Sequence, residues 1–240
     1  QMTNNQVETN SSNMEAVDRL MRQAIAEEIF PGGVLLVSKK GATLFFKAYG
    51  VINLSSRAPV NLETIFDLAS LTKPLATALG VMMLIQRKKI ELDNTLGMIL
   101  PESKNTDKAQ VKVKHLLYHN SGLPDYRPYY RTLSRLPQKA RRKALRECLL
   151  KETLVNAIGQ KVLYSDLGFM ILAWVIEHIS GQRLDHFIAQ QIYRPLGLRH
   201  LFFISSDTPL YEGRFAATEN CRWRDMILEG QVHDENAYAV

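Results

Sequence analysis

The sequence has little cysteine and no long apolar run. Its two cysteines, Cys148 and Cys221, form neither a disulfide framework nor a CxxC metal-binding pair. The longest nearly uninterrupted apolar stretch, 75–85, is far shorter than the roughly 20 residues needed to cross a bilayer. GxGxxG, Walker and GxSxG motifs are missing as well. These absences exclude a disulfide-rich scaffold and give no sign of dinucleotide binding, a P-loop or a nucleophile elbow.

The composition is that of a globular protein with one concentrated basic segment. Of the 240 residues, 46% are hydrophobic and 22% are charged, which excludes wholesale disorder. Nine basic residues and a single acid fall between Arg127 and Lys151, although the formal net charge of the chain is only +6. A solvated helical face is the favoured interpretation of this segment, so no nucleic-acid partner is expected. An anionic-surface site remains the alternative.

Hydrophobic spacing predicts a mostly helical chain with sheet material near the N-terminus. Residues 1–13 are polar and predict a disordered tail, and 14–29 have the periodicity of an amphipathic helix. Two β-like runs, 34–38 and 43–49, flank Lys39-Lys40-Gly41 and predict a hairpin. Further helices are predicted over 70–87, 115–117, 138–150, 167–179 and 184–192.

Ser70 and Lys73 form the most informative pair in the sequence. At positions i and i+3 they share one face at the start of the predicted apolar helix. Serine becomes a nucleophile when a neighbouring base takes its proton, and a lysine serves if burial and positive charge keep it neutral. An isolated SxxK also arises by chance, but the position at a helix start favours chemistry.

A second candidate motif, Tyr164-Ser165-Asp166, comes directly before the predicted helix 167–179. A tyrosine hydroxyl beside a serine and a lysine can carry a proton to a leaving group. Taken alone, the motif is better explained by Ser165 or Asp166 capping the helix while Tyr164 packs.

Together these motifs resemble the serine β-lactamase and penicillin-binding protein superfamily, in particular its class C-like branch with esterases and D-aminopeptidases. Other segments add to the resemblance, which runs from about residue 14 to 240. They are FDLAS at 66–70, IELD at 90–93, HNSGLP at 119–124, YSDLGFMIL at 164–172 and the following Ser180-Gly181.

The resemblance implies an α/β (α+β) fold of the β-lactamase/transpeptidase type, with an antiparallel sheet flanked by helices. It places one hydrolase domain over 14–240, with an all-helical lobe at about 66–230. Ser70 would be the acylated nucleophile, Lys73 its base and Tyr164 the second proton carrier. The implied substrate is an ester, an amide or peptide, or a β-lactam, including peptidoglycan-like molecules, and no cofactor is expected. The family favours a periplasmic or extracellular location, with a cytoplasmic one left open.

Two departures from the family pattern affect this interpretation. Asp166 stands where the family usually has asparagine, and its charge would repel the carboxylate of a β-lactam, which favours an esterase or peptidase-like hydrolase. The third family motif, a Lys/His-x-Gly triplet of the oxyanion pocket, is missing after Tyr164. We therefore expect an incomplete catalytic unit, poorly active alone, whose sheet is completed by downstream residues or another chain.

The sequence allows two other interpretations. His115 and His119 have the i, i+4 spacing of a zinc HExxH motif, but Leu116 replaces the glutamate and no third ligand is evident, so no metal is expected. The alternative to an enzyme is an inactive protein of the same fold that binds peptidoglycan or an anionic surface.

Overall fold

The computed structural model describes residues 11–204 and 215–240, which form two compact units. Among these residues, 11–67 and 215–231 make up the first unit, and 68–204 and 232–240 the second. The helical unit therefore begins close to the predicted boundary at 66. Residues 215–231, predicted as part of the helical lobe, group instead with the N-terminal hairpin.

The first unit is built on one helix and one hairpin. Helix α1 spans Ser11–Ala26, three residues ahead of its predicted position. Strands β1 (Gly32–Lys39) and β2 (Ala42–Gly50) pair antiparallel, as predicted, and each is longer than the β-like run that indicated it. Lys40 and Gly41 take positive φ angles of 51° and 82°, which allows the tight turn between the strands.

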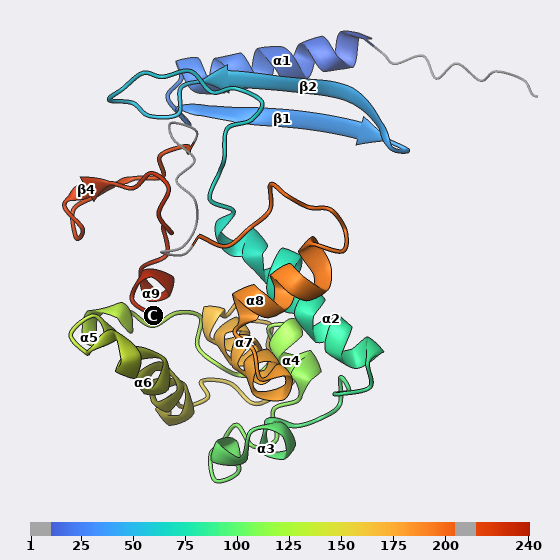
Figure 1. Ribbon diagram of the computed structural model, residues 1–240, viewed down its shortest axis with the longest axis vertical. Helices are drawn as coiled ribbons and strands as arrows, with labels where there is room; N and C mark the ends of the chain where they lie inside the picture. Colours follow the sequence, from blue (N-terminus) through green and yellow to red (C-terminus); the bar gives the residue numbers. More distant parts are fainter. Residues whose placement is uncertain (1–10, 205–214) are drawn as a thin grey trace, which may run out of the picture. The chain divides into compact units, whose positions relative to one another are not determined.

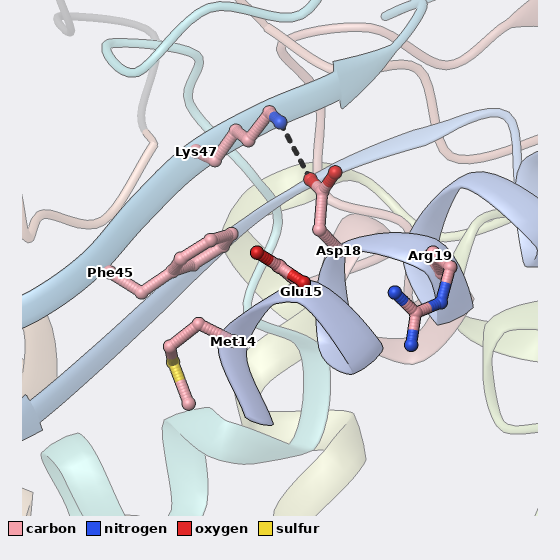
Figure 2. Close-up of a pocket in the computed structure, with 6 residues that line it drawn as sticks. All are labelled: Met14, Glu15, Asp18, Arg19, Phe45 and Lys47. Atoms are coloured by element: carbon pink, nitrogen blue, oxygen red, sulfur yellow. Dashed lines mark ion pairs between the residues drawn. The ribbon is translucent and has the colours of Figure 1, made fainter. Parts of the chain in front are cut away.

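Asp18 connects α1 to β2 (Figure 2). Its carboxylate lies 2.6 Å from Lys47 Nζ and accepts a hydrogen bond of 2.7 Å from the Tyr49 hydroxyl. The bonds from Lys47, Tyr49 and Arg22 hold the pKa of Asp18 far below its usual range. Burial, together with Asp18, raises the pKa of Tyr49 to about 12. Figure 2 shows Met14, Glu15 and Phe45 beside this ion pair, so the helix lies on the hairpin through both apolar and charged contacts.

Two further strands of the first unit have no strand signal in the sequence. Strands β3 (Asn220–Cys221) and β4 (Met226–Ile227) pair antiparallel over two residues each. Isolated bridges join Val51 to Pro59 and Ile65 to Phe215. In the described ranges both sheets are two-stranded, and strands this short lie below the length at which alternation can be recognised.

The second unit is helical, as predicted for the lobe. Its α-helices are α2 (Leu79–Gln86), α3 (Leu96–Ile99), α4 (Val113–Leu117), α5 (Tyr130–Leu133), α6 (Gln138–Lys151), α7 (Asp166–Ser180), α8 (Leu184–Ile188) and α9 (Glu235–Tyr238). Short 3₁₀ segments cover Ala69–Leu71 and Pro101–Ser103, and π-helical segments cover Lys73–Ala78 and Ala189–Tyr193.

Helix α7 is the centre of the second unit. It contacts α2, α4, α6 and α8, which gather around it in Figure 1. Leu167, Leu172 and Ile176 on α7 are fully buried, and burial of such side chains supplies most of the stabilisation of a helical core. The approach of α2 is close, because a Cβ on Gly80 would lie 2.8 Å from Ile176 Cδ1. This packing fixes α2, which continues the helical segment that begins at the SxxK motif, and α7, which begins two residues after Tyr164.

The helix predicted over 70–87 is helical throughout but not uniformly α. A 3₁₀ turn at Ala69–Leu71 leads into the π segment Lys73–Ala78 before regular α-helix begins at Leu79. Pro74 lacks the N–H that would bond to the carbonyl four residues earlier, so the first turn is not held in α register. Such local widening of helices is frequent at functional sites.

Candidate active site

The SxxK motif lies at the start of its helical segment, and its two side chains are in contact. Ser70 falls in the 3₁₀ turn and is exposed, whereas the Lys73 side chain is only 15% exposed. Lys73 Nζ donates a hydrogen bond of 3.1 Å to Ser70 Oγ. Ala69, directly before the serine, has a φ of +46°, a strained conformation for a residue with a Cβ. The serine hydroxyl is therefore held at a sharp entry into the helix.

The second motif meets the first through Asp166. Ser165 is the N-cap of α7 and accepts a hydrogen bond from Gly168 N–H at 3.2 Å. Asp166 is the first helical residue, and its carboxylate lies 2.7 Å from Lys73 Nζ. The cap and the carboxylate thus belong to different residues: Ser165 satisfies the helix end, and Asp166 faces the lysine.

Two aromatic rings lie around the lysine ammonium. Lys73 Nζ is 4.8 Å from the ring centroid of Tyr164 and 5.9 Å from that of Phe169, both within cation–π range. Tyr164 is 51% exposed, so its hydroxyl remains accessible from solvent. Ser70, Lys73, Tyr164 and Asp166, all predicted as site residues, are brought together here.

His119 also belongs to this cluster, although its position in the sequence predicts no role in the reaction. Its ring centroid is 4.5 Å from that of Tyr164, and its Nδ1 accepts a hydrogen bond of 3.0 Å from Ser165 N–H. Its own φ is +56°. In the sequence the HNSGLP segment shows only a likeness to the family, and the approach of His119 to Ser165 across 46 positions has no local signal.

The electrostatics of the cluster favour a charged lysine and a neutral histidine. Burial lowers the pKa of Lys73, but the hydrogen bonds to Asp166 and Tyr164 outweigh it and leave the pKa above its ordinary value. Burial, followed by the charge of Lys73, lowers the pKa of His119. At neutral pH the site therefore holds an ammonium, whereas a base of the kind expected from the sequence needs a neutral amine.

His115 and His119, which have the spacing of a zinc motif, each accept a hydrogen bond from a backbone N–H group. His115 Nδ1 accepts a hydrogen bond of 3.1 Å from Lys112 N–H at the start of α4, while His119 faces Ser165. Over residues 11–204 and 215–240, no group of three or more His, Cys, Asp and Glu side chains is placed to hold a metal ion. Over the same residues, no helix is both long and apolar enough to span a membrane.

The basic segment 127–151 is largely engaged within the second unit. Arg142 and Arg146 on α6 pair with Glu177 of α7 at 3.3 and 2.9 Å. Arg146 also lies over the Trp174 ring at 5.3 Å. Arg127 pairs with Glu152, and Arg141 donates to three backbone carbonyls. These contacts explain much of the charge excess by helix packing.

The C-terminal residues 232–240 are part of the second unit. Asp234 caps α9 by accepting a hydrogen bond of 2.7 Å from Ala237 N–H. Asn236, 1% exposed, accepts from Tyr130 N–H at 2.8 Å and donates to the Arg127 carbonyl at 2.9 Å. The segment thus anchors the backbone around α5, beside which α9 lies (Figure 1).

A helical unit that joins an SxxK motif to a tyrosine motif defines the serine β-lactamase and penicillin-binding class of proteins. The chain belongs to the Beta-lactamase family, which it matches over residues 17–224. The resemblance predicted from the motifs and the predicted fold class are thereby confirmed. The family includes serine hydrolases that act as peptidases, esterases and β-lactamases.

Curated relatives and a solved structure extend over nearly the whole chain. An N-acetylmuramyl-L-alanine amidase of Bacillus subtilis (strain 168) is 32% identical over 94% of this chain and 56% of its own length. A putative D-alanyl-D-alanine carboxypeptidase of Escherichia coli O157:H7 is 29% identical over 95% of this chain and 58% of its own. The structure of EstCE1, a hydrolase with promiscuous acyltransferase activity, matches with a TM-score of 0.73 and 26% identity, covering 93% of this chain and 60% of that one. The chain therefore spans under two thirds of the length of these proteins.

Proposed function

We propose that this chain carries the acylation site of a serine hydrolase in which Ser70 forms a covalent acyl-enzyme. The observation that carries the proposal is the contact of Lys73 Nζ with both Ser70 Oγ at 3.1 Å and Asp166 at 2.7 Å. A serine within hydrogen-bonding reach of a base that is itself oriented by a third group is the general arrangement of an activated nucleophile.

The proposed reaction has two halves. Ser70 Oγ adds to the acyl carbon while its proton passes to the neutral form of Lys73, and Tyr164 carries a proton to the departing alcohol or amine. Water then attacks the acyl-ester and releases the acid, which restores the Ser70 hydroxyl.

The resting ammonium sets the pH dependence of this reaction. Protonated Lys73 donates to Ser70 Oγ and orients it, but it cannot accept the serine proton. Because the pKa of Lys73 is raised, the neutral form is scarce at pH 7 and increases about tenfold with each pH unit. We expect the rate constant for acylation to rise in the same way.

The proposed substrate is a peptide amide or ester of the kind found in peptidoglycan fragments. Two relatives are named for cleavage of amide and peptide bonds, and one structural neighbour for hydrolysis and acyl transfer. Within this class Asp166 favours an amide or ester bond with no free carboxylate beside it, unlike the bond that a carboxypeptidase cleaves, because its negative charge beside Lys73 disfavours a substrate carboxylate.

Intact-mass spectrometry tests the proposal directly. The protein is incubated with a fluorophosphonate, a penicillin and a short-chain nitrophenyl ester, and Ser70→Ala is treated in parallel. We expect an adduct on the unchanged protein with at least one reagent and none on the variant. Folded protein that forms no adduct with any of the three would favour a binding protein of the same fold.

A further inference from the structure

The backbone of the segment 119–130 holds the start of α7. Ser165 Oγ donates a hydrogen bond of 2.6 Å to the Pro124 carbonyl, and Asp166 N–H donates one of 2.9 Å to the Asp125 carbonyl. Because the Asp166 carboxylate lies 2.7 Å from Lys73 Nζ, a shift of these two carbonyls would move the carboxylate relative to the lysine.

Glu152 anchors the same segment at Arg127 and Tyr129, using both of its carboxylate oxygens. One oxygen accepts a hydrogen bond of 2.9 Å from Arg127 Nε and lies 2.9 Å from Nη2 of the same guanidinium. The other oxygen accepts a hydrogen bond of 2.9 Å from the Tyr129 hydroxyl. The Glu152 side chain is 16% exposed. Charge-assisted hydrogen bonds at such a mostly buried carboxylate hold their partner groups in place better than exposed ion pairs do.

The backbone of Glu152 is itself held by a buried lysine. Lys108, 2% exposed, donates from Nζ to the Glu152 carbonyl and pairs with Asp107 at 2.6 Å. The other oxygen of Asp107 accepts from Leu154 N–H at 2.8 Å. A buried ammonium is stable only with such partners, so the backbone at Glu152 has little freedom to move.

We propose that Glu152 is a positioning residue for the reaction at Ser70. Its carboxylate fixes the segment 119–130, and that segment sets the place of Asp166 against Lys73. The inference rests on the proposed function. It needs no contact between Glu152 and the substrate, since the effect passes through backbone carbonyls to the Asp166 carboxylate.

The test combines Glu152→Ala with the conservative Glu152→Gln, which keeps an acceptor oxygen at one of the two positions. Glu147→Ala is the matched control, because this exposed glutamate lies five residues away at the end of α6. Asn236 continues to hold the backbone of Arg127 and Tyr130 in every variant. If Glu152→Ala does not fold, Tyr129→Phe removes one of the hydrogen bonds alone and takes its place.

The first measurement is the rate constant for labelling of Ser70 by a fluorophosphonate, separated from the affinity for the reagent. At pH 7 Glu152→Ala is expected to label about three- to fivefold faster with little change in affinity, because a displaced Asp166 carboxylate stabilises the Lys73 ammonium less and leaves more of the neutral amine. Glu152→Gln should stay within about twofold of wild type, and Glu147→Ala should be unchanged. In the Asp166→Asn background Glu152→Ala should alter the rate constant by less than about twofold, because two residues that act through one contact are not additive. Slower labelling of Glu152→Ala, an equal change in both backgrounds, or no change in either would overturn the proposal.

The second measurement follows the ¹⁵N resonance of the Lys73 ammonium during a pH titration. In Glu152→Ala the ammonium should lose its proton at a lower pH than in wild type, in the direction of Asp166→Asn. This readout needs no labelling of Ser70, so it decides the positioning role even if the proposed acylation fails. A Lys73 titration that is identical in Glu152→Ala and wild type would refute it.

Discussion

Asp166→Asn separates the two effects that the carboxylate is expected to have. In the structure it lies 2.7 Å from Lys73 Nζ, and the two side chains are 28% and 15% exposed. Two charges at that distance and partial solvation stabilise each other by about 1–2 kcal/mol. Without the charge, the pKa of Lys73 falls, because burial still lowers it and the largest opposing contribution is gone.

We expect Asp166→Asn to accelerate acylation at pH 7. A loss of about 1–2 kcal/mol of ammonium stabilisation makes the neutral lysine roughly tenfold more abundant, so kcat/KM for a neutral nitrophenyl ester should rise by about tenfold. For a penicillin with a free carboxylate the gain should be several-fold larger, because a like charge has also been removed from the site. The helix cap is Ser165, so the substitution leaves the hydrogen bond to Gly168 in place.

The assay is ester hydrolysis and penicillin acylation from pH 6 to 10, with Asp93→Asn as the control. Asp93 forms an ion pair with Lys112 and Lys114 instead of Lys73, so its loss should leave both rates unchanged. A slower Asp166→Asn enzyme with both substrates would refute the reasoning, because it would mean that Lys73 acts as the ammonium. Equal acceleration of both substrates would show that Asp166 does not face the substrate carboxylate.

Three further predictions concern the framework of the site. Gly122→Ala should lower the free energy of unfolding in urea by more than about 3 kcal/mol, because the new Cβ would clash with the Asn156 carbonyl oxygen at a φ of +87°. Gly181→Ala is the control: its φ is +68° but the space around it is open, so the same measurement should show a loss of only about 1 kcal/mol. Ser165→Ala should cost about 1–3 kcal/mol in thermal unfolding, because it removes a cap and a buried hydrogen bond. The lowered pKa of His119 means that the unfolded chain binds its proton more readily, so stability should decrease as pH falls below about 6.5, and less so in His119→Gln.

The parts of the fold that the sequence predicts well are those whose signals are local. Helix α7 is an apolar run bounded by Ser165 and by Gly181, whose φ of +68° ends the helix. The β1–β2 hairpin follows from two β-like runs and a short turn. Contact between Ser70 and Lys73 is likewise local, since any helical turn brings i and i+3 together.

Other features depend on contacts between distant residues and have no local signal. His119 meets Ser165, and Glu152 meets Arg127, across 46 and 25 positions. Lys108 is typical in sequence of a surface residue, yet it is 2% exposed because Asp107 and the Glu152 carbonyl satisfy its ammonium. A single sequence does not show which partners will offset the free-energy cost of burying such a charge.

The charge on Lys73 is where local reasoning from the sequence and the geometry diverge most. A serine–lysine pair predicts a neutral amine kept so by burial and positive charge, but the nearest ionic partner of Lys73 is a carboxylate. The paired charges of Lys73 and Asp166 cancel, and the lowered pKa of His119 leaves that ring neutral near pH 7. An anionic substrate therefore gains little from the ammonium and meets the carboxylate beside it, whereas a neutral ester or amide loses nothing. Asp166, which pairs with Lys73, thus affects both the proton transfer and the choice of substrate, and this makes it the most informative position to change.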